Sequence, residues 1–194
     1  SRAEYFLTQL NVLRTYLRLF IFPIRQNLDY DYPISRHLFE HETWLSFVLL
    51  GALFVFALWS LKRRRLVAFG ILWFFLTLSV ESSLIPIRDV IFEHRLYLPM
   101  PGLALALSAG LVSLIKDAKK QIALFSVLLV CFSSATYSRN ELWKDGIRLW
   151  QDVAKKSPKK ARAYHNLAFL TSARGQFEKA LEYGEKALEL QPND

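Results

Sequence analysis

Four long apolar runs constrain this chain more than any other feature. They are Trp44–Leu61, Leu66–Val80, Pro101–Ile115 and Gln121–Tyr137, and none of them contains Asp, Glu, Lys or Arg. A helix of about 20 apolar residues crosses the hydrocarbon core of a bilayer, and a somewhat shorter one suffices where its ends are buried in protein. We therefore predict four transmembrane helices within residues 44–137. The hydrophobic content of 53% agrees with a membrane protein.

Basic residues are concentrated in the two short loops Lys62–Arg65 and Lys116–Lys120. Short basic loops stay on the cytoplasmic side of a membrane. The loop Glu81–Pro99 and the C-terminal region are then predicted to face the periplasm or a lumen. Because the net charge of +8 gathers at these topology signals, we expect no nucleic-acid partner, which would require a basic soluble face.

The N-terminal part, residues 1–43, is predicted to hold an amphipathic helix and an outer loop. Apolar residues recur at helical spacing in Glu4–Phe22, but Gln9, Asn11, Arg14 and Arg18 interrupt them. A helix with this pattern is expected to lie at the membrane interface. The alternative is a helix that docks on other membrane helices that are missing from this sequence.

Residues 138–194 are predicted to form tetratricopeptide-type helices. Pro158 and Pro192 are 34 residues apart, which is the period of this repeat. Asn140–Ser157 is interpreted as the second helix of a preceding repeat whose first helix is the end of the fourth membrane span. The positions that match the repeat consensus are Tyr164, Leu167, Ala168, Gly175, Phe177, Ala180, Ala187 and Pro192, whereas Thr171 and Gly184 depart from it. The predicted fold class is all-α: a polytopic membrane helix bundle followed by a tetratricopeptide-type α-solenoid.

The outer loop Glu81–Pro99 contains the strongest candidate site. Ionisable residues close to a bilayer are costly unless they are paired or bind a ligand. Guanidinium groups bind phosphate oxygens in a bidentate manner, so this loop is a candidate site for the phosphate of a lipid-linked sugar. The candidate residues are Arg88, Glu93, His94, Arg95 and Tyr97. The alternative is that Arg88–Asp89 and Glu93–Arg95 are structural ion pairs.

Two weaker patterns are candidates for a divalent metal. Asp29 and Asp31 form an Asp-x-Asp motif whose carboxylates are suitable metal ligands, although aspartates beside a proline also occur in ordinary turns. His37 and His41 are one helical turn apart, as in metal-binding pairs. An interfacial position beside Trp44 is the alternative for these histidines.

The order of these motifs resembles a known family. An amphipathic helix followed by QNLDYDYP, the segment FEHRLYLP between two spans, and tetratricopeptide repeats are similar to the transmembrane O-mannosyltransferases with tetratricopeptide repeats and their bacterial relatives. The resemblance covers nearly the whole chain, which is similar to the C-terminal half of the membrane domain plus the first repeats. It implies a GT-C type membrane glycosyltransferase in the bacterial inner membrane or the endoplasmic reticulum.

The resemblance also implies the reaction. Such enzymes pass a sugar from a polyprenyl-phosphate carrier to protein hydroxyls outside the cytoplasm, with Arg88, His94 and Arg95 expected at the lipid phosphate. The repeats are expected to bind an acceptor or partner protein through Tyr164, Asn166 and Phe169. The acidic catalytic residue of the family lies in an earlier loop, so no catalytic residue is assigned here and this chain alone is expected to be inactive. The alternative is a non-enzymatic membrane-anchored scaffold or a subunit of a larger membrane complex.

Overall fold

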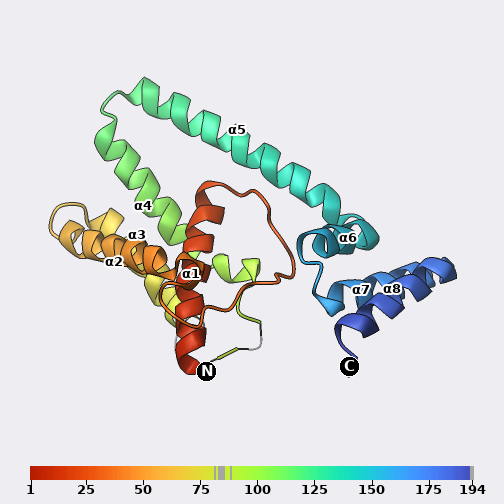
Figure 1. The fold of residues 1–194 in the computed structure, drawn as a ribbon. Coiled ribbons are helices and arrows are strands. Elements are labelled where there is room, and N and C mark those ends of the chain that lie inside the picture. Colours follow the sequence, from red (N-terminus) through yellow and green to blue (C-terminus); the bar gives the residue numbers. More distant parts are fainter. Residues whose placement is uncertain (81, 83–85, 88, 193–194) are drawn as a thin grey trace. The chain divides into compact units, whose positions relative to one another are not determined.

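All regular structure in the described part of the chain is helical (Figure 1). The computed structural model describes residues 1–80, 82, 86–87 and 89–192. These residues divide into two compact units, one formed by residues 1–26 and 32–127 and the other by residues 27–31 and 128–194. The all-α prediction is confirmed for the described residues.

The first unit contains the predicted apolar helices. Its elements are α1 (Arg2–Ile21), the short 3₁₀ helix η1 (Glu40–Glu42), α2 (Thr43–Ser60), α3 (Arg65–Ser79), the 3₁₀ helix η2 (Glu93–Leu96), α4 (Pro99–Leu114) and the start of α5 (Ala118–Trp143). The bounds of α2, α3 and α4 agree within two residues with the predicted runs. α4 begins at Pro99, where a missing N–H breaks no intrahelical hydrogen bond.

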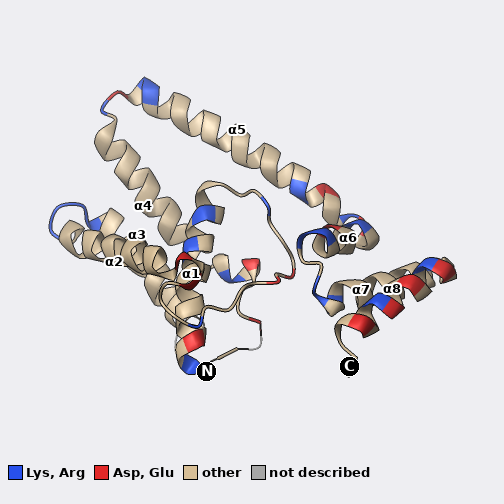
Figure 2. Cartoon of the chain, viewed as in Figure 1, with Lys and Arg blue, Asp and Glu red and all other residues tan. Residues whose placement is uncertain are grey.

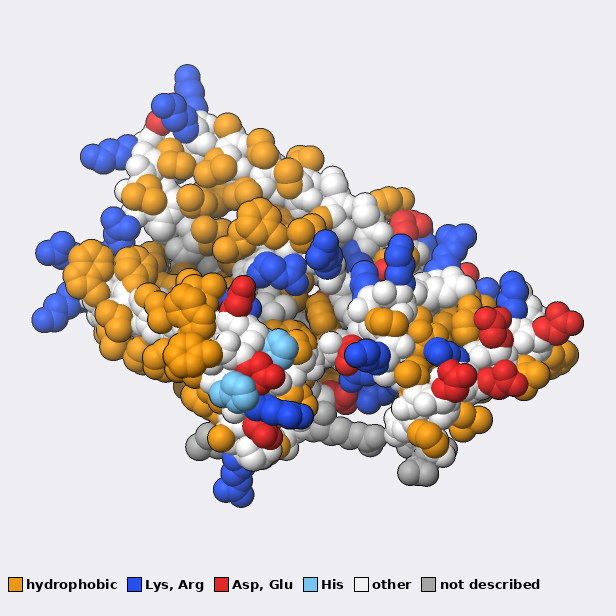
Figure 3. Space-filling view, in the orientation of Figure 1, with side chains coloured by type: hydrophobic (Ala, Val, Ile, Leu, Met, Phe, Trp, Pro, Cys, Tyr) orange, Lys and Arg blue, Asp and Glu red, His pale blue; other side chains and the backbone are white. Residues whose placement is uncertain are grey.

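Two helical segments in the described residues, Glu40–Ser60 and Ala118–Trp143, are long and apolar enough to cross a membrane. α3 and α4 are apolar but shorter, with 15 and 16 residues. Figure 2 shows the apolar helices almost free of charged residues, with Lys and Arg at the α2–α3 and α4–α5 loops. Hydrophobic side chains cover much of the exposed side of α2 in Figure 3. Four spans therefore remain a prediction, and two segments meet the length requirement.

α1 buries the polar residues that led us to expect a surface helix. Gln9 and Asn11 are 1% and 2% exposed. The Asn11 amide donates to the hydroxyl oxygens of Ser35 (3.0 Å) and Thr43 (2.8 Å), and its carbonyl oxygen accepts a hydrogen bond from Ser46 (2.6 Å). α1 is thus docked on α2 and the preceding loop, both of which belong to this chain. Its position relative to a membrane surface stays a prediction.

α3 and α4 pack closely because each has a glycine at their contact. A Cβ atom on Gly70 would lie 2.1 Å from the Gly102 carbonyl oxygen, and one on Gly102 would lie 2.5 Å from Cδ1 of Trp73. Small residues let the backbones of membrane helices approach each other. Ala106 continues this contact into a buried cluster with Ala57 of α2 and with Val67 and Ile71 of α3.

The second unit contains the end of α5, α6 (Gly146–Lys156), α7 (Ala161–Ala173) and α8 (Phe177–Leu190). A helix lies within Asn140–Ser157 as predicted, but it begins six residues later than expected. α5 continues to Trp143, and α6 begins at Gly146 because the Asp145 side chain accepts the Ile147 N–H (2.9 Å) as an N-cap. Arg174 also bonds this carboxylate, at 3.0 and 3.4 Å, and lowers its pKa.

α6 and α7 together provide the core of the second unit, in which α6 buries Ile147, Leu149 and Val153, and α8 packs beside α7. Ala163, Leu167 and Thr171 are buried on α7, while α8 has no buried residue. Thr171, which stands where the repeat consensus has a larger aromatic residue, is 1% exposed and donates its hydroxyl to the Leu167 carbonyl (2.6 Å). Of the positions that match the repeat consensus, Leu167 is buried, whereas Tyr164 and Ala180 are only half-buried. α7 and α8 form a helical hairpin, and both the tetratricopeptide repeat and the α-solenoid remain predictions.

The close α3–α4 contact predicts a large effect of a single methyl group. Gly70→Ala should lower the unfolding temperature markedly, because the added Cβ meets backbone that cannot move aside. Gly110→Ala is the matched control, since nothing lies within 4 Å of its added Cβ and alanine favours a helix by about 1 kcal/mol over glycine. Thermal unfolding of the full-length protein in detergent measures both. Equal unfolding temperatures for the two variants would contradict the packing described.

The ion pairs of Asp152 in the second unit are expected to make the stability of the protein depend on pH. Burial alone would raise the pKa of this carboxyl, but hydrogen bonds from Lys156 (2.6 Å) and Arg139 (2.8 Å) outweigh it and lower the pKa below 3.8. A depressed native pKa stabilises the fold above the unfolded value, and this stability is lost as the pH falls through the native pKa. The unfolding temperature of Asp152→Asn should therefore lie below that of the wild type at pH 6 and approach it below pH 3.8. A constant difference across this range would rule out the contribution, and exposed Asp31→Asn is the control.

Candidate functional site

The candidate loop ends in a short helix that leads directly into α4. η2 covers Glu93–Leu96. Ile91 and Leu96, which are 2% and 3% exposed, anchor the segment on both sides of the charged residues. His94 and Tyr97 are exposed between and beyond these anchors. The apolar residues thus fix the backbone while the polar side chains remain accessible.

α1 holds this segment through two side chains. The Gln9 amide donates to the Val90 carbonyl at 2.9 Å. The Tyr16 hydroxyl donates to the Phe92 carbonyl (2.9 Å) and accepts the Phe92 N–H (3.2 Å). Because Tyr16 is fully buried, its ring cannot turn away without opening the core. The backbone of Phe92 is therefore fixed on both sides of its Cα.

The Phe92 ring brings two candidate residues together. The Arg95 guanidinium carbon lies 5.4 Å from its centroid, and the His94 ring is stacked on it at 5.1 Å with an interplanar angle of 25°. Arg95 also donates to the carbonyl oxygens of Asp89 (3.1 Å) and Val90 (3.4 Å). These contacts orient a permanent cation beside an imidazole. A guanidinium held by carbonyls and an aromatic ring is suited to binding an anion such as phosphate.

The structure places the predicted residues of this site as follows. Glu93 and Arg95 are half-buried and His94 is exposed, all within η2. Tyr97 follows η2 and is 79% exposed, so its hydroxyl can reach a ligand or the interface. Arg88 lies outside the described residues.

Sequence reasoning missed the residues that support the site. Phe92 is part of the quoted segment FEHRLYLP but was given no role. Gln9 was taken only as a polar residue that interrupts a surface helix. Tyr16 was not singled out. A buried polar side chain in α1 has to find a partner, and that requirement was the available signal. It did not indicate which segment would supply the partner.

The metal candidates have other partners in the structure. Asp29 is 3% exposed, and its carboxylate is paired with Lys160 (3.4 Å) and Arg162 (3.3 Å) inside the second unit. Asp31 is exposed and donates its backbone N–H to the Ser157 hydroxyl at 2.9 Å. An ion pair with two basic side chains explains why a carboxylate is buried at position 29.

The two histidines lie beside one carboxylate. Nε2 of His37 and Nε2 of His41 are 3.8 and 3.5 Å from carboxylate oxygens of Glu40. Among the described residues, no group of three or more His, Cys, Asp or Glu side chains could hold a metal ion. The metal at Asp29 and Asp31 remains a prediction without a described third ligand.

The predicted protein-binding residues all lie on α7. Phe169 is 68% exposed, while Tyr164 and Asn166 are half-buried. The Asn166 amide donates to the Arg162 carbonyl at 2.8 Å, within its own helix. Of the three, Phe169 offers the largest apolar surface to a partner.

Comparison with known proteins finds distant relatives. The chain is 27% identical over 162 residues to the protein O-mannosyl-transferase Tmtc3 of Drosophila melanogaster, covering 78% of this chain and 17% of that protein. It is 31% identical over 120 residues to Tmtc2 of the same organism, covering 60% and 13%. Human TMTC3, also named a protein O-mannosyl-transferase, is 26% identical over 157 residues, covering 78% and 17%.

The C-terminal part of the chain also matches a family model. Residues 133–194 match the model of a family described as a domain of unknown function, DUF6340. No solved structure matches the chain. The chain spans less than a fifth of the length of the relatives named above. It is therefore a distant homologue of a segment of proteins named protein O-mannosyl-transferases.

The double hydrogen bond of Tyr16 predicts a specific loss of order in the candidate loop. Tyr16→Phe should destabilise the protein by about 1–3 kcal/mol, because the backbone of Phe92 loses its buried partner. Hydrogen exchange should speed up in residues 89–97 more than in α7. Tyr137→Phe, at a position 69% exposed, is the matched control. Unchanged exchange in residues 89–97 would show that Tyr16 does not hold the loop.

Proposed function

We propose that this chain is part of a membrane glycosyltransferase that passes a sugar from a polyprenyl-phosphate carrier to protein hydroxyls. The reaction takes place on the periplasmic or lumenal side, in the bacterial inner membrane or the endoplasmic reticulum. Residues 89–97 bind the phosphate of the carrier. Two kinds of observation support the proposal: the relatives are named protein O-mannosyl-transferases, and Arg95 and His94 are organised on one aromatic ring.

The placement of Arg95 is the observation that carries the proposal. A guanidinium fixed by the Asp89 and Val90 carbonyls loses little additional freedom when a phosphate binds. Charge develops on the phosphate oxygens as the bond to the sugar breaks, and preoriented cations stabilise such charge without reorganising. His94, stacked on the same ring as Arg95, contributes a second donor. Tyr97 is two residues from Arg95, and we place its hydroxyl at a sugar hydroxyl or in the headgroup region.

The acceptor hydroxyl needs a general base, which we do not assign to this chain. A base has to be within hydrogen-bond reach of the proton that it removes. Glu93 is the carboxylate nearest in sequence to Arg95, and we give it a structural role in the phosphate-binding loop. Residues 89–97 thus supply the cations that stabilise the leaving phosphate, and no residue of this chain is given the role of the base.

The helices of the second unit present the acceptor or partner protein. Stacked helical hairpins bind extended segments on one face. Phe169 on α7 offers an exposed apolar side chain on such a hairpin. The half-buried Tyr164 and Asn166 precede it on the same helix.

A second function is a membrane-anchored scaffold without catalysis. The observation that favours it is the exposure of Phe177 (70%), Leu181 (65%) and Leu188 (58%) on α8, because apolar residues clustered on one helix usually mark a protein contact. A scaffold would bind proteins through α8 and show no dependence on Arg95.

The test is the affinity of the full-length protein for polyprenyl phosphate in detergent. Arg95→Ala should weaken binding at least tenfold, since a hydrogen bond to a charged group contributes about 1.5–3 kcal/mol. Arg95→Lys should be intermediate, because lysine keeps the charge but not the bidentate geometry. His94→Ala, at an exposed position, tests the site without touching the carbonyl contacts of Arg95. Exposed Arg36→Ala is the control and should bind as the wild type does.

Two results would overturn the proposal. The first is unchanged affinity in both Arg95→Ala and His94→Ala, with circular dichroism showing intact helices. The second is an equal loss in Arg36→Ala, which would assign the effect to overall charge. Either result, together with retained binding of a protein partner, would favour the scaffold.

A further inference from the structure

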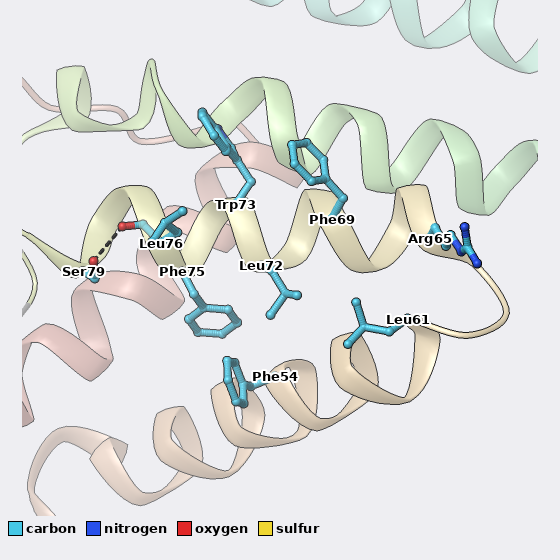
Figure 4. A pocket seen from close by; sticks show the side chains of 9 residues that line it. All are labelled: Phe54, Leu61, Arg65, Phe69, Leu72, Trp73, Phe75, Leu76 and Ser79. Atoms are coloured by element: carbon cyan, nitrogen blue, oxygen red, sulfur yellow. Dashed lines mark hydrogen bonds between the residues drawn. The ribbon is translucent and has the colours of Figure 1, made fainter.

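A groove between α2 and α3 remains outside the function proposed above. It has a volume of about 510 Å³, within the range of roughly 300–1,000 Å³ that small-molecule sites occupy. Figure 4 shows its side chains, which come from both helices and are almost all apolar. The lining residues are Phe54, Leu61, Arg65, Phe69, Leu72, Trp73, Phe75, Leu76 and Ser79.

The walls of the groove are held in place by local contacts. Phe54 and Phe75 meet edge to face, with their ring centroids 5.5 Å apart at 88°. The Trp73 indole donates to the Leu98 carbonyl at 2.8 Å, which fixes the orientation of its ring. Phe69 and Leu76 nevertheless remain 53% and 65% exposed. Because these side chains are held in place, they cannot close the groove by packing on one another. Their exposed apolar surface is therefore suited to a bound acyl chain.

One end of the groove is strongly basic. Arg65 lines it, and it directly follows Lys62, Arg63 and Arg64. Arg63 lies over the Trp59 ring at 5.5 Å. No ion pair with a carboxylate involves Lys62, Arg64 or Arg65 in the part of the chain that the structure describes. The charge at this end is therefore not neutralised by the described acidic residues.

We propose that this groove binds one anionic phospholipid, with its phosphate at the Arg64–Arg65 end and an acyl chain along Phe69 and Leu76. The lining residues run from Arg65 to Ser79 along α3, which is about 21 Å at 1.5 Å per residue. That length exceeds the ~15 Å half-thickness of the hydrocarbon core. The groove is thus long enough to hold an acyl chain from the basic end to the middle of the bilayer.

Charge selects this occupant over a neutral lipid. Basic pockets between membrane helices on the cytoplasmic side bind anionic headgroups, and each nearby Lys or Arg contributes about 1 kcal/mol. The short basic loop places this end of the groove in the cytoplasm by the positive-inside rule. The phosphate site proposed at Arg95 is expected on the opposite side. The inference rests on the membrane embedding of α2 and α3 and does not depend on sugar transfer.

Native mass spectrometry of the full-length protein in detergent tests the inference, with phosphatidylglycerol and phosphatidylcholine as the two probes. One phosphatidylglycerol should bind in preference to phosphatidylcholine. Replacing both Arg64 and Arg65 by alanine should weaken its binding about 30-fold, from about 1 kcal/mol per basic residue. Replacing both Lys119 and Lys120 by alanine is the matched control, because it removes the same charge from the other predicted cytoplasmic loop and should leave binding within twofold.

A second variant tests the groove without changing its charge. Leu76→Trp fills the groove at an exposed position, so the fold should persist while phosphatidylglycerol binding falls. Arg95→Ala should keep phosphatidylglycerol bound even where it loses polyprenyl phosphate, which separates failure of this inference from failure of the proposed function.

Several outcomes would overturn the inference. One is equal binding of the two phospholipids, and another is an equal loss in the Lys119 and Lys120 variant. Unchanged binding in Leu76→Trp would place the lipid elsewhere. Displacement of phosphatidylglycerol by equimolar polyprenyl phosphate would assign the groove to the sugar carrier. If no lipid is retained, the groove does not bind phospholipid, and a protein segment becomes its expected occupant.

Discussion

The buried amide of Asn11 is the interaction on which the candidate site depends. Its hydrogen bonds to Ser35, Thr43 and Ser46 join α1 to the preceding loop and to α2. Each of these four side chains is at most 2% exposed, so a broken bond would leave a polar group unsatisfied in the core. Connected buried polar groups hold a packing arrangement in one geometry, because partial satisfaction is costly. α1 is therefore a rigid support rather than a mobile surface helix.

The rigidity of α1 determines how the charged loop is presented. Tyr16 and Gln9 project from the same helix and bond the backbone at Phe92 and Val90. The Phe92 ring in turn contacts the His94 ring, which is stacked on it, and the Arg95 guanidinium, which lies over it. The energetic cost of orienting the guanidinium is thus met in the folded state, which is what electrostatic catalysis and anion binding require. A flexible loop with the same residues would lose that advantage.

The helices could be predicted from the sequence more accurately than the site. Each apolar helix ends near a charged or proline-containing segment, so the bounds of α2, α3 and α4 followed from local composition. The burial of Asn11 was not predicted, because a polar residue in an amphipathic pattern indicates an exposed position. The partners that bury it come from distant segments. Asp29 is explained by Lys160 and Arg162, more than 100 residues away in sequence. Such tertiary contacts have no local pattern, which is why the supporting residues of the site were missed.

The most direct test of the central claim is to map where a polyprenyl phosphate contacts the full-length protein. A photoactivatable group placed next to the phosphate would be crosslinked in a native membrane, and the modified peptides would be sequenced. The account predicts crosslinks in residues 92–97, lost in Arg95→Ala and retained in Arg36→Ala. Crosslinks confined to the groove between α2 and α3, or to the other basic loop, would contradict the assignment of the phosphate site to Arg95 and His94.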